Sequence, residues 1–248
     1  MALSAYLIIG FILYISQRSL IYYPVSQINH SYNTEQFAVN NVSISAVVVN
    51  EQSDHAIMYF GGNAETVVGE AAVFERIFPH HTLYLINYRG YAGSTGKPTE
   101  VGLYEDAVKI FDILSKRHQT ISAIGRSLGS GVVTYLASVR KPERLVLVTP
   151  FDSLQSLAQE IYPVYPMSLL LKDKYDSISR VEEIEAPVLI IVADEDYIVP
   201  RKNTQRLIAA FPPTQVKAYV IERGGHNSVS ITGEYYQVIQ DYLNEPRS

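Results

Sequence analysis

The sequence has no cysteine and no tryptophan, and neither sign of charge is in large excess. Without cysteine, the chain has no thiol nucleophile, no disulfide and no thiolate ligand for a metal. Its 20 Lys and Arg residues stand against 25 Asp and Glu residues, for a net charge of −5. Since nucleic-acid binding needs a basic surface, we expect no nucleic-acid partner.

Charged residues are also few, at 18% of the 248 residues, whereas hydrophobic residues make up 47%. This composition and length suit one globular α/β domain with a large core. From about residue 37 onward, apolar runs alternate with helical patterns, which is typical of a mainly parallel sheet flanked by helices. The predicted strands are Val42–Val49, Ala56–Phe60, Thr82–Asn87, Thr120–Gly125, Arg144–Thr149, Val188–Ala193 and Val216–Ile221. The predicted helices are Glu65–Phe78, Val101–Arg117, Leu128–Arg140, Arg201–Phe211 and Ser230–Leu243.

One stretch, from Phe151 to Glu185, interrupts this alternation because it is far longer than a crossover helix needs. We expect it to form a small cap at about residues 151–185, over the carboxyl edge of the sheet, where ligands bind in such folds. Its apolar side chains are candidates for an acyl pocket or for the core of the cap. They are Tyr162, Val164, Tyr165, Met167 and Leu169.

A long apolar run lies at the N-terminus, where Ala2 to Ile15 is interrupted only by Ser4. As a helix, it would extend about 21 Å, short of the ~30 Å hydrocarbon core of a bilayer unless the residues up to Tyr22-Tyr23 lengthen it. A cleaved signal peptide is disfavoured, because no Lys or Arg precedes the run and no small-x-small site follows it.

Two interpretations of this segment remain open. We expect residues 1–18 to form an uncleaved, single-pass membrane anchor, followed by one domain over residues 19–248. Arg18 favours a cytoplasmic domain by the positive-inside rule, although one charge decides little. The alternative is a helix packed on the domain with one apolar face buried. That face would comprise Leu7, Ile8, Phe11 and Ile12.

A G-x-S-x-G motif runs from Gly125 to Gly129 and lies between a predicted strand and a predicted helix. The motif is weak alone, but in this order it is typical of a serine nucleophile, Ser127, on a sharp strand-to-helix turn. Such a serine needs a base, which follows late in the chain, and a carboxylate that orients the base. His226, after Gly224-Gly225 at the end of the last strand, is the candidate base.

The orienting carboxylate is expected at the end of the preceding strand, which runs into Asp194-Glu195-Asp196. We favour Asp196, because it stands far enough past the strand to reach His226. Asp194 is the substitute, although we expect its short side chain to bond the backbone of its own turn.

Backbone amides that stabilise an oxyanion are expected from two places. One is Leu128, which follows the nucleophile, and the other is Asn63 in the glycine-rich loop after the Ala56–Phe60 strand. The alternative for this loop is a close packing contact without a chemical role. A second glycine-studded loop, Asn87 to Ser94, is expected to pack around the site.

Further motifs extend over nearly the whole chain. They are Gln17 to Pro24, Gly62-Asn63-Ala64, Tyr88 to Tyr91, Gly96 to Thr99, Gly125 to Gly129, Pro150-Phe151 with Ser153, Ala186 to Ile190, Asp196 to Pro200 and Gly225-His226-Asn227. With these motifs, the chain resembles membrane-anchored, single-domain α/β-hydrolases of the serine esterase and acyl-hydrolase type. The resemblance implies the α/β-hydrolase fold and a catalytic Ser127, Asp196 and His226. That family usually has a histidine where Gly61 stands here, so a looser oxyanion loop is expected.

These observations together predict a serine hydrolase that cleaves an acyl ester or thioester through an acyl-enzyme intermediate. The expected partner is a small-molecule acyl substrate, and this chemistry requires no metal and no cofactor. A serine peptidase of the same fold is an alternative. A pseudo-hydrolase that binds ligands without turnover is another, which the three filled triad positions oppose.

Overall fold

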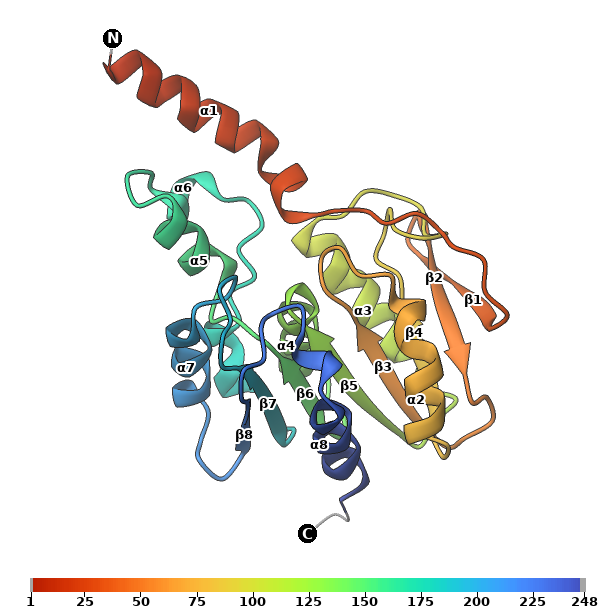
Figure 1. Ribbon diagram of the computed structural model, residues 1–248. Coiled ribbons are helices and arrows are strands. Elements are labelled where there is room, and N and C mark those ends of the chain that lie inside the picture. Colours follow the sequence, from red (N-terminus) through yellow and green to blue (C-terminus); the bar gives the residue numbers. More distant parts are fainter. Residues whose placement is uncertain (1, 246–248) are drawn as a thin grey trace.

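The computed structural model describes residues 2–245, so Met1 of the predicted anchor and residues 246–248 of the predicted domain lie outside the described residues. An eight-stranded mixed sheet has the spatial order β1-β2-β4-β3-β5-β6-β7-β8 (Figure 1). Strand β2 is antiparallel to both β1 and β4, and the other neighbouring pairs are parallel. The strands are β1 (Asn33–Val39), β2 (Val42–Val49), β3 (His55–Phe60), β4 (Thr82–Ile86), β5 (Thr120–Arg126), β6 (Leu145–Val148), β7 (Val188–Ala193) and β8 (Val216–Ile221).

Helices cover both faces of the sheet, and the strand residues alternate between two cores (Figure 1). Along β3, Met58 packs in the core that contains α3 and α4, whereas Ile57 and Tyr59 pack with α2 and α8. The helices are α1 (Ala2–Ile21), α2 (Ala71–Ile77), α3 (Glu100–Leu114), α4 (Leu128–Val139), α5 (Leu154–Ile161), α6 (Met167–Leu170), α7 (Arg201–Ala210) and α8 (Gly233–Asn244). Short 3₁₀ helices are η1 (Val67–Glu70), η2 (Ile178–Glu183) and η3 (Val229–Ile231).

The predicted alternation of strands and helices around a mainly parallel sheet is confirmed. Each predicted strand corresponds to one of β2 to β8, with ends that differ by at most one residue. Strand β1 is absent from the prediction because only Phe37 and Val39 in it are buried, which leaves a weak apolar pattern at the edge of the sheet. The single helix predicted at Glu65–Phe78 is also wrong in detail, since η1 precedes the shorter α2.

The segment predicted to form a cap, residues 151–185, contains α5, α6 and η2. Helices α5 and α6 lie beside α1 rather than on a face of the sheet (Figure 1). The Tyr165 ring, in the turn between these two helices, stacks on Tyr6 of α1 with centroids 4.6 Å apart. The cap segment and α1 are therefore in direct contact.

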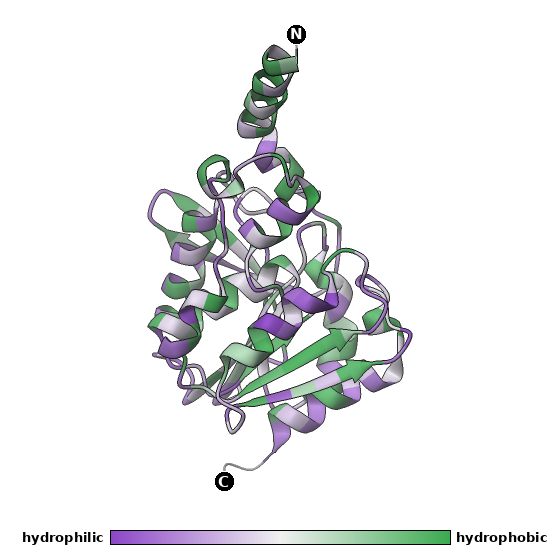
Figure 2. Cartoon of the chain, turned by 90° about the vertical axis from the view of Figure 1, so that its left-hand side faces the viewer, coloured by the Kyte–Doolittle hydropathy of each residue, from purple (hydrophilic) through white to green (hydrophobic). Residues whose placement is uncertain are grey.

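Helix α1 projects from the rest of the chain (Figure 2). Its 20 residues are long and apolar enough to cross a membrane, with a length of about 30 Å at the usual helical rise. The alternative in which Leu7, Ile8, Phe11 and Ile12 are buried on the domain is wrong, since these side chains are 51% to 64% exposed. Only Gly10 and Gln17 of this helix are buried.

Candidate active site

Ser127 occupies a sharp turn between the end of β5 at Arg126 and the start of α4 at Leu128. Its backbone has φ 50° and ψ −114°, a combination that non-glycine residues rarely adopt. The Ser127 amide donates to the Val148 carbonyl at 2.9 Å, which holds the turn to the end of β6. The strained turn leaves Ser127 partly exposed beyond the end of its strand.

Two glycines make this turn possible because a side chain at either position would collide with the backbone. A Cβ at Gly125 would lie 2.3 Å from the Gly129 carbonyl oxygen, and one at Gly129 would lie 2.1 Å from the Phe60 carbonyl oxygen. The second contact also brings the start of α4 against the end of β3. The glycines of the motif are therefore required by packing.

The structure brings the predicted triad residues into one hydrogen-bonded chain. His226 Nε2 lies 2.8 Å from Ser127 Oγ, and His226 Nδ1 lies 2.7 Å from Asp196 Oδ2. The side chains of His226 and Asp196 are only 6% and 4% exposed. The three residues follow β5, β7 and β8, whose carboxyl ends lie at one edge of the parallel part of the sheet.

Asp196 is fixed by two further hydrogen bonds. Its Oδ1 accepts from the amides of Ile198 and Val199 at 2.9 and 2.8 Å, which leaves Oδ2 directed at His226. Asp194 instead pairs with Arg201 at 2.8 Å. The expectation that Asp194 bonds its own turn is therefore wrong, and Asp196 makes those backbone contacts as well as the contact to the imidazole.

The turn that carries His226 does not depend on a left-handed backbone at either of its two glycines. The left-handed residue in it is Arg223, with φ 55°, and neither Gly224 nor Gly225 has a positive φ. The Gly225 amide donates to Ser228 Oγ at 3.1 Å, and Glu195 donates to the Gly224 carbonyl at 2.9 Å. These bonds join the histidine turn to the turn that carries the acidic residues.

The loop after β3 lies beside Ser127, since a Cβ at Gly62 would be 3.9 Å from the Ser127 Cβ. The Gly62 amide is occupied, because it donates to Glu65 Oε2 at 2.9 Å. Within residues 2–245, the amides of Asn63 and Leu128 donate no hydrogen bond to another group of the chain. The N–H groups of these two predicted positions are thus free to donate hydrogen bonds to a ligand oxygen.

Asn63 is held by the last residue of α1 and by a residue that follows it. Its side-chain Nδ2 donates to the Ile21 carbonyl at 3.0 Å, and its own carbonyl accepts from the Tyr23 amide at 3.2 Å. The Tyr91 hydroxyl also donates to the Asn63 carbonyl, at 2.8 Å. The Gly61 carbonyl accepts from the Tyr88 hydroxyl at 2.5 Å. The loop is therefore held by several hydrogen bonds in spite of glycine at position 61.

Arg126, which lies between Gly125 and Ser127 in the G-x-S-x-G motif, is a site residue that the sequence did not predict. It contacts Glu65 Oε2 at 3.4 Å and the carbonyls of His226 and Asn227 at 3.4 and 3.3 Å. Burial lowers its pKa, but the negative charge of Glu65 acts in the opposite direction and the net shift is upward, so the guanidinium stays charged. Arg126 therefore links the oxyanion loop to the histidine turn.

No family model matches the chain. An uncharacterized protein of Mycobacterium tuberculosis is 41% identical over 151 residues, which cover 59% of this chain and 53% of that protein. The chain thus spans about half the length of this relative. An uncharacterized membrane protein of Saccharomyces cerevisiae is 27% identical over 80% of this chain and 74% of its own. Human alpha/beta hydrolase domain-containing protein 17B is 25% identical, over 83% of this chain and 72% of its own.

Among solved structures, an esterase of Pyrococcus furiosus superposes with a TM-score of 0.73 at 16% identity, over 89% of this chain and 95% of that one. The chain is an α/β-hydrolase by fold. This confirms the fold that the resemblance implied, and the human sequence relative is named as an alpha/beta hydrolase domain-containing protein. Helix α1 is long and apolar enough to cross a membrane, and the yeast relative is described as a membrane protein.

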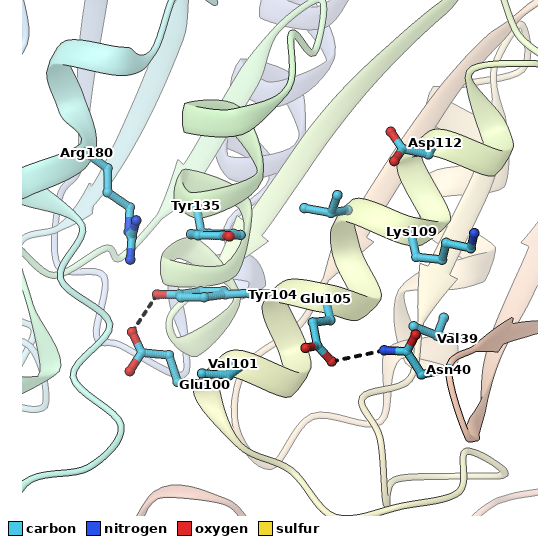
Figure 3. Close-up of a pocket in the computed structure, with 11 residues that line it drawn as sticks. Val39, Asn40, Glu100, Val101, Tyr104, Glu105, Lys109, Asp112, Tyr135 and Arg180 are labelled. Carbon is cyan, nitrogen blue, oxygen red and sulfur yellow. Dashed lines mark hydrogen bonds between the residues drawn. The ribbon is translucent and has the colours of Figure 1, made fainter.

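A cavity of about 620 Å³ lies elsewhere on the hydrolase, against α3, α4 and η2 (Figure 3). It contains none of the predicted triad residues, and two of its charged groups, Arg180 and Glu100, are engaged with the chain. Arg180 lies over the stacked rings of Tyr104 and Tyr135, at 5.3 and 4.6 Å from their centroids. Glu100 accepts hydrogen bonds from Tyr104 and from the amides of Lys174 and Tyr175. These contacts join α3, α4 and the cap segment, and they do not form a second reactive site.

We predict that Gly129→Ala lowers the free energy of unfolding of the hydrolase by roughly 3 kcal/mol or more, because its Cβ must displace the backbone of β3. Urea denaturation measures the loss. Gly233→Ala is the matched control, since a Cβ there meets no heavy atom within 4 Å, and it should be neutral or stabilising by up to about 1 kcal/mol. Equal stability of the two variants would contradict the packing argument.

Proposed function

We propose that the protein is a serine hydrolase that cleaves an acyl ester or thioester through a covalent acyl-enzyme on Ser127. The observation that carries this proposal is the continuous chain of hydrogen bonds from Asp196 through His226 to Ser127, at 2.7 and 2.8 Å. A serine hydroxyl is a weak nucleophile unless a positioned base removes its proton, and this chain supplies the base and its orienting carboxylate.

In the first half of the reaction, Ser127 Oγ attacks the substrate carbonyl carbon and its proton passes to His226 Nε2. The tetrahedral intermediate collapses, and His226 gives that proton to the leaving alcohol or thiol. Water then attacks the acyl-enzyme with His226 again as the base, which releases the carboxylic acid and restores the serine. Asp196 holds the imidazole in the required orientation and stabilises its protonated form.

The oxyanion of each tetrahedral intermediate accepts hydrogen bonds from the amides of Asn63 and Leu128. Two features support this assignment. Both N–H groups lack an acceptor within the described part of the chain, and the neighbouring Gly62 amide is already bound to Glu65. The Asn63 loop is also fixed before substrate arrives, which is the condition under which such donors lower a barrier most.

The N-terminal helix anchors this enzyme in a membrane as a single, uncleaved span. The apolar side chains of Leu3, Leu7, Ile8, Phe11 and Ile15 are 59% to 71% exposed, and a bilayer is the environment in which that exposure is favourable. Arg18 at the carboxyl side of the span favours a domain in the cytoplasm. The domain then comprises residues 19–248, with the cap at about residues 151–185.

The first test is Ser127→Ala in the full-length protein. We expect hydrolysis of p-nitrophenyl acetate to fall by about 10⁵–10⁶-fold, since the nucleophile and the base act as a unit. Labelling by a fluorophosphonate probe should disappear, while the melting temperature stays near that of the unmodified protein. Ser138→Ala, also on α4 but bonded only to the Tyr135 carbonyl, is the control. A folded Ser127→Ala protein that keeps most of its activity overturns the proposal, and activity on peptides alone would favour a peptidase.

The carboxylate is tested by comparing two neighbouring substitutions. Asp196→Asn should lower kcat by about 10⁴-fold, because an amide neither holds the correct imidazole tautomer nor stabilises the imidazolium. Asp194→Asn should change kcat by less than about threefold, since it removes only a surface ion pair with Arg201. Steady-state kinetics on p-nitrophenyl acetate measure both. Equal losses in the two variants would show that Asp196 has no special role.

The anchor is tested by deleting residues 1–16, which leaves Gln17 and Arg18 in place. The full-length protein should stay with membranes through an alkaline carbonate wash, whereas the shortened protein should be soluble without detergent. Its Ser127 should still react with a fluorophosphonate probe, because the triad is built from strand ends far along the chain. A full-length protein that is soluble without detergent, together with a shortened one that aggregates, contradicts the anchor.

A further inference from the structure

An apolar groove of about 270 Å³ lies between the carboxyl-terminal half of α1 and the helices α5 and α6. Helix α1 contributes Leu13 and Leu20, and α5 contributes Leu157 and Ala158. No charged side chain lines it. Gln17 borders the groove, but its amide is engaged by the Tyr14 and Leu170 carbonyls and by the Lys172 amide. The groove therefore offers hydrocarbon contacts and few free polar groups.

Two of the lining residues connect the groove to the candidate active site. Ile21, the last residue of α1, accepts a hydrogen bond from Asn63 of the oxyanion loop through its carbonyl. Ile198 donates its amide to Asp196 of the triad. Asn63 and Asp196 are therefore each hydrogen-bonded directly to a residue that lines the groove.

We propose that this groove binds the unbranched acyl chain of a membrane-resident ester or thioester, with the carbonyl placed at Ser127. The proposal rests on the hydrolase function above and names the part of the substrate that the enzyme selects. A groove without charged lining residues suits a hydrocarbon chain and not a polar headgroup or a peptide. Its volume of about 270 Å³ suits a hydrocarbon chain of medium length.

The position of α1 indicates that the acyl chain comes from the lipid phase. One side of α1 lines the groove, and the opposite side of the same helix carries the exposed apolar residues that would face the bilayer. Beside it, Ile161, Val164 and Leu169 of the cap segment are 66% to 80% exposed. The apolar surface of α1 thus continues onto the cap, and an acyl chain can move from the lipid phase into the groove without crossing water.

The test uses full-length protein reconstituted in phosphatidylcholine vesicles, with p-nitrophenyl esters of acetate, octanoate, decanoate and palmitate. We expect kcat/KM to rise from acetate to decanoate and to level off beyond it, where the chain exceeds the groove. Ala158→Phe fills the groove from α5 and should lower the decanoate-to-acetate ratio of kcat/KM at least tenfold. Leu20→Trp fills it from α1, where the side chain is half exposed and tolerates a larger ring, and should lower the same ratio.

Ala72→Phe on α2 is the matched control, because Ala72 is exposed and outside the groove, and it should keep the ratio of the unmodified protein. A ratio unchanged in both groove variants, with acetate still hydrolysed in a Ser127-dependent manner, overturns the acyl groove and leaves the hydrolase intact. Absence of Ser127-dependent acetate hydrolysis in the unmodified protein would instead overturn the proposed function. If only Ala158→Phe lowers the ratio, α1 is not a wall of the site and the proposal fails in this form.

Discussion

The hydrogen bond from Ser127 Oγ to His226 Nε2 is the constraint on which the arrangement of the site depends. It joins residues 99 positions apart in the sequence. At a length of 2.8 Å, it allows only small shifts in the position of the serine turn or the histidine turn. The serine is held by a strained backbone that only the flanking glycines allow. The histidine is held by Asp196, by the carbonyl contacts of Arg126 and by the turn at Gly225. Parallel pairing of β5, β6, β7 and β8 brings these turns to one edge.

Most of the fold and the meeting of Ser127, His226 and Asp196 could be predicted from the sequence, because both depend on local patterns. Buried parallel strands are continuous apolar runs, and the nucleophile lies in a short motif between a strand and a helix. Strand β1 could not be found in this way, since an edge strand with two buried residues lacks such a pattern. The roles of Arg126 and Glu65 were also out of reach. Arg126 lies 61 positions from Glu65 and 100 positions from His226 in the sequence. A single sequence carries no periodic signal for contacts over such separations.

The N-terminal segment has two roles that its hydropathy alone does not reveal. An apolar run predicts only a membrane segment, yet Ile21 and Tyr23 hold the Asn63 loop through backbone groups. Such contacts do not depend on side-chain identity, so no motif marks them. The Asn63 loop is stabilised partly by residues at the end of α1 and just beyond it. The candidate site is therefore complete only when the chain beyond α1 is in place.

The same segment also fixes the direction of α1 relative to the site. Arg18 pairs with Asp173 at 2.8 Å, and Asp173, with a side chain only 3% exposed, also accepts from the Glu100 amide. The hydroxyls of Tyr22 and Tyr175 lie 2.9 Å apart, and burial raises the pKa of both, so the pair stays protonated and uncharged. A helix held by an ion pair to a buried carboxylate, with a buried hydroxyl pair just beyond its end, cannot swing as on a flexible linker. In the proposed arrangement, with α1 across a bilayer, the cap segment and the groove beside it are consequently held at a fixed position against the membrane surface.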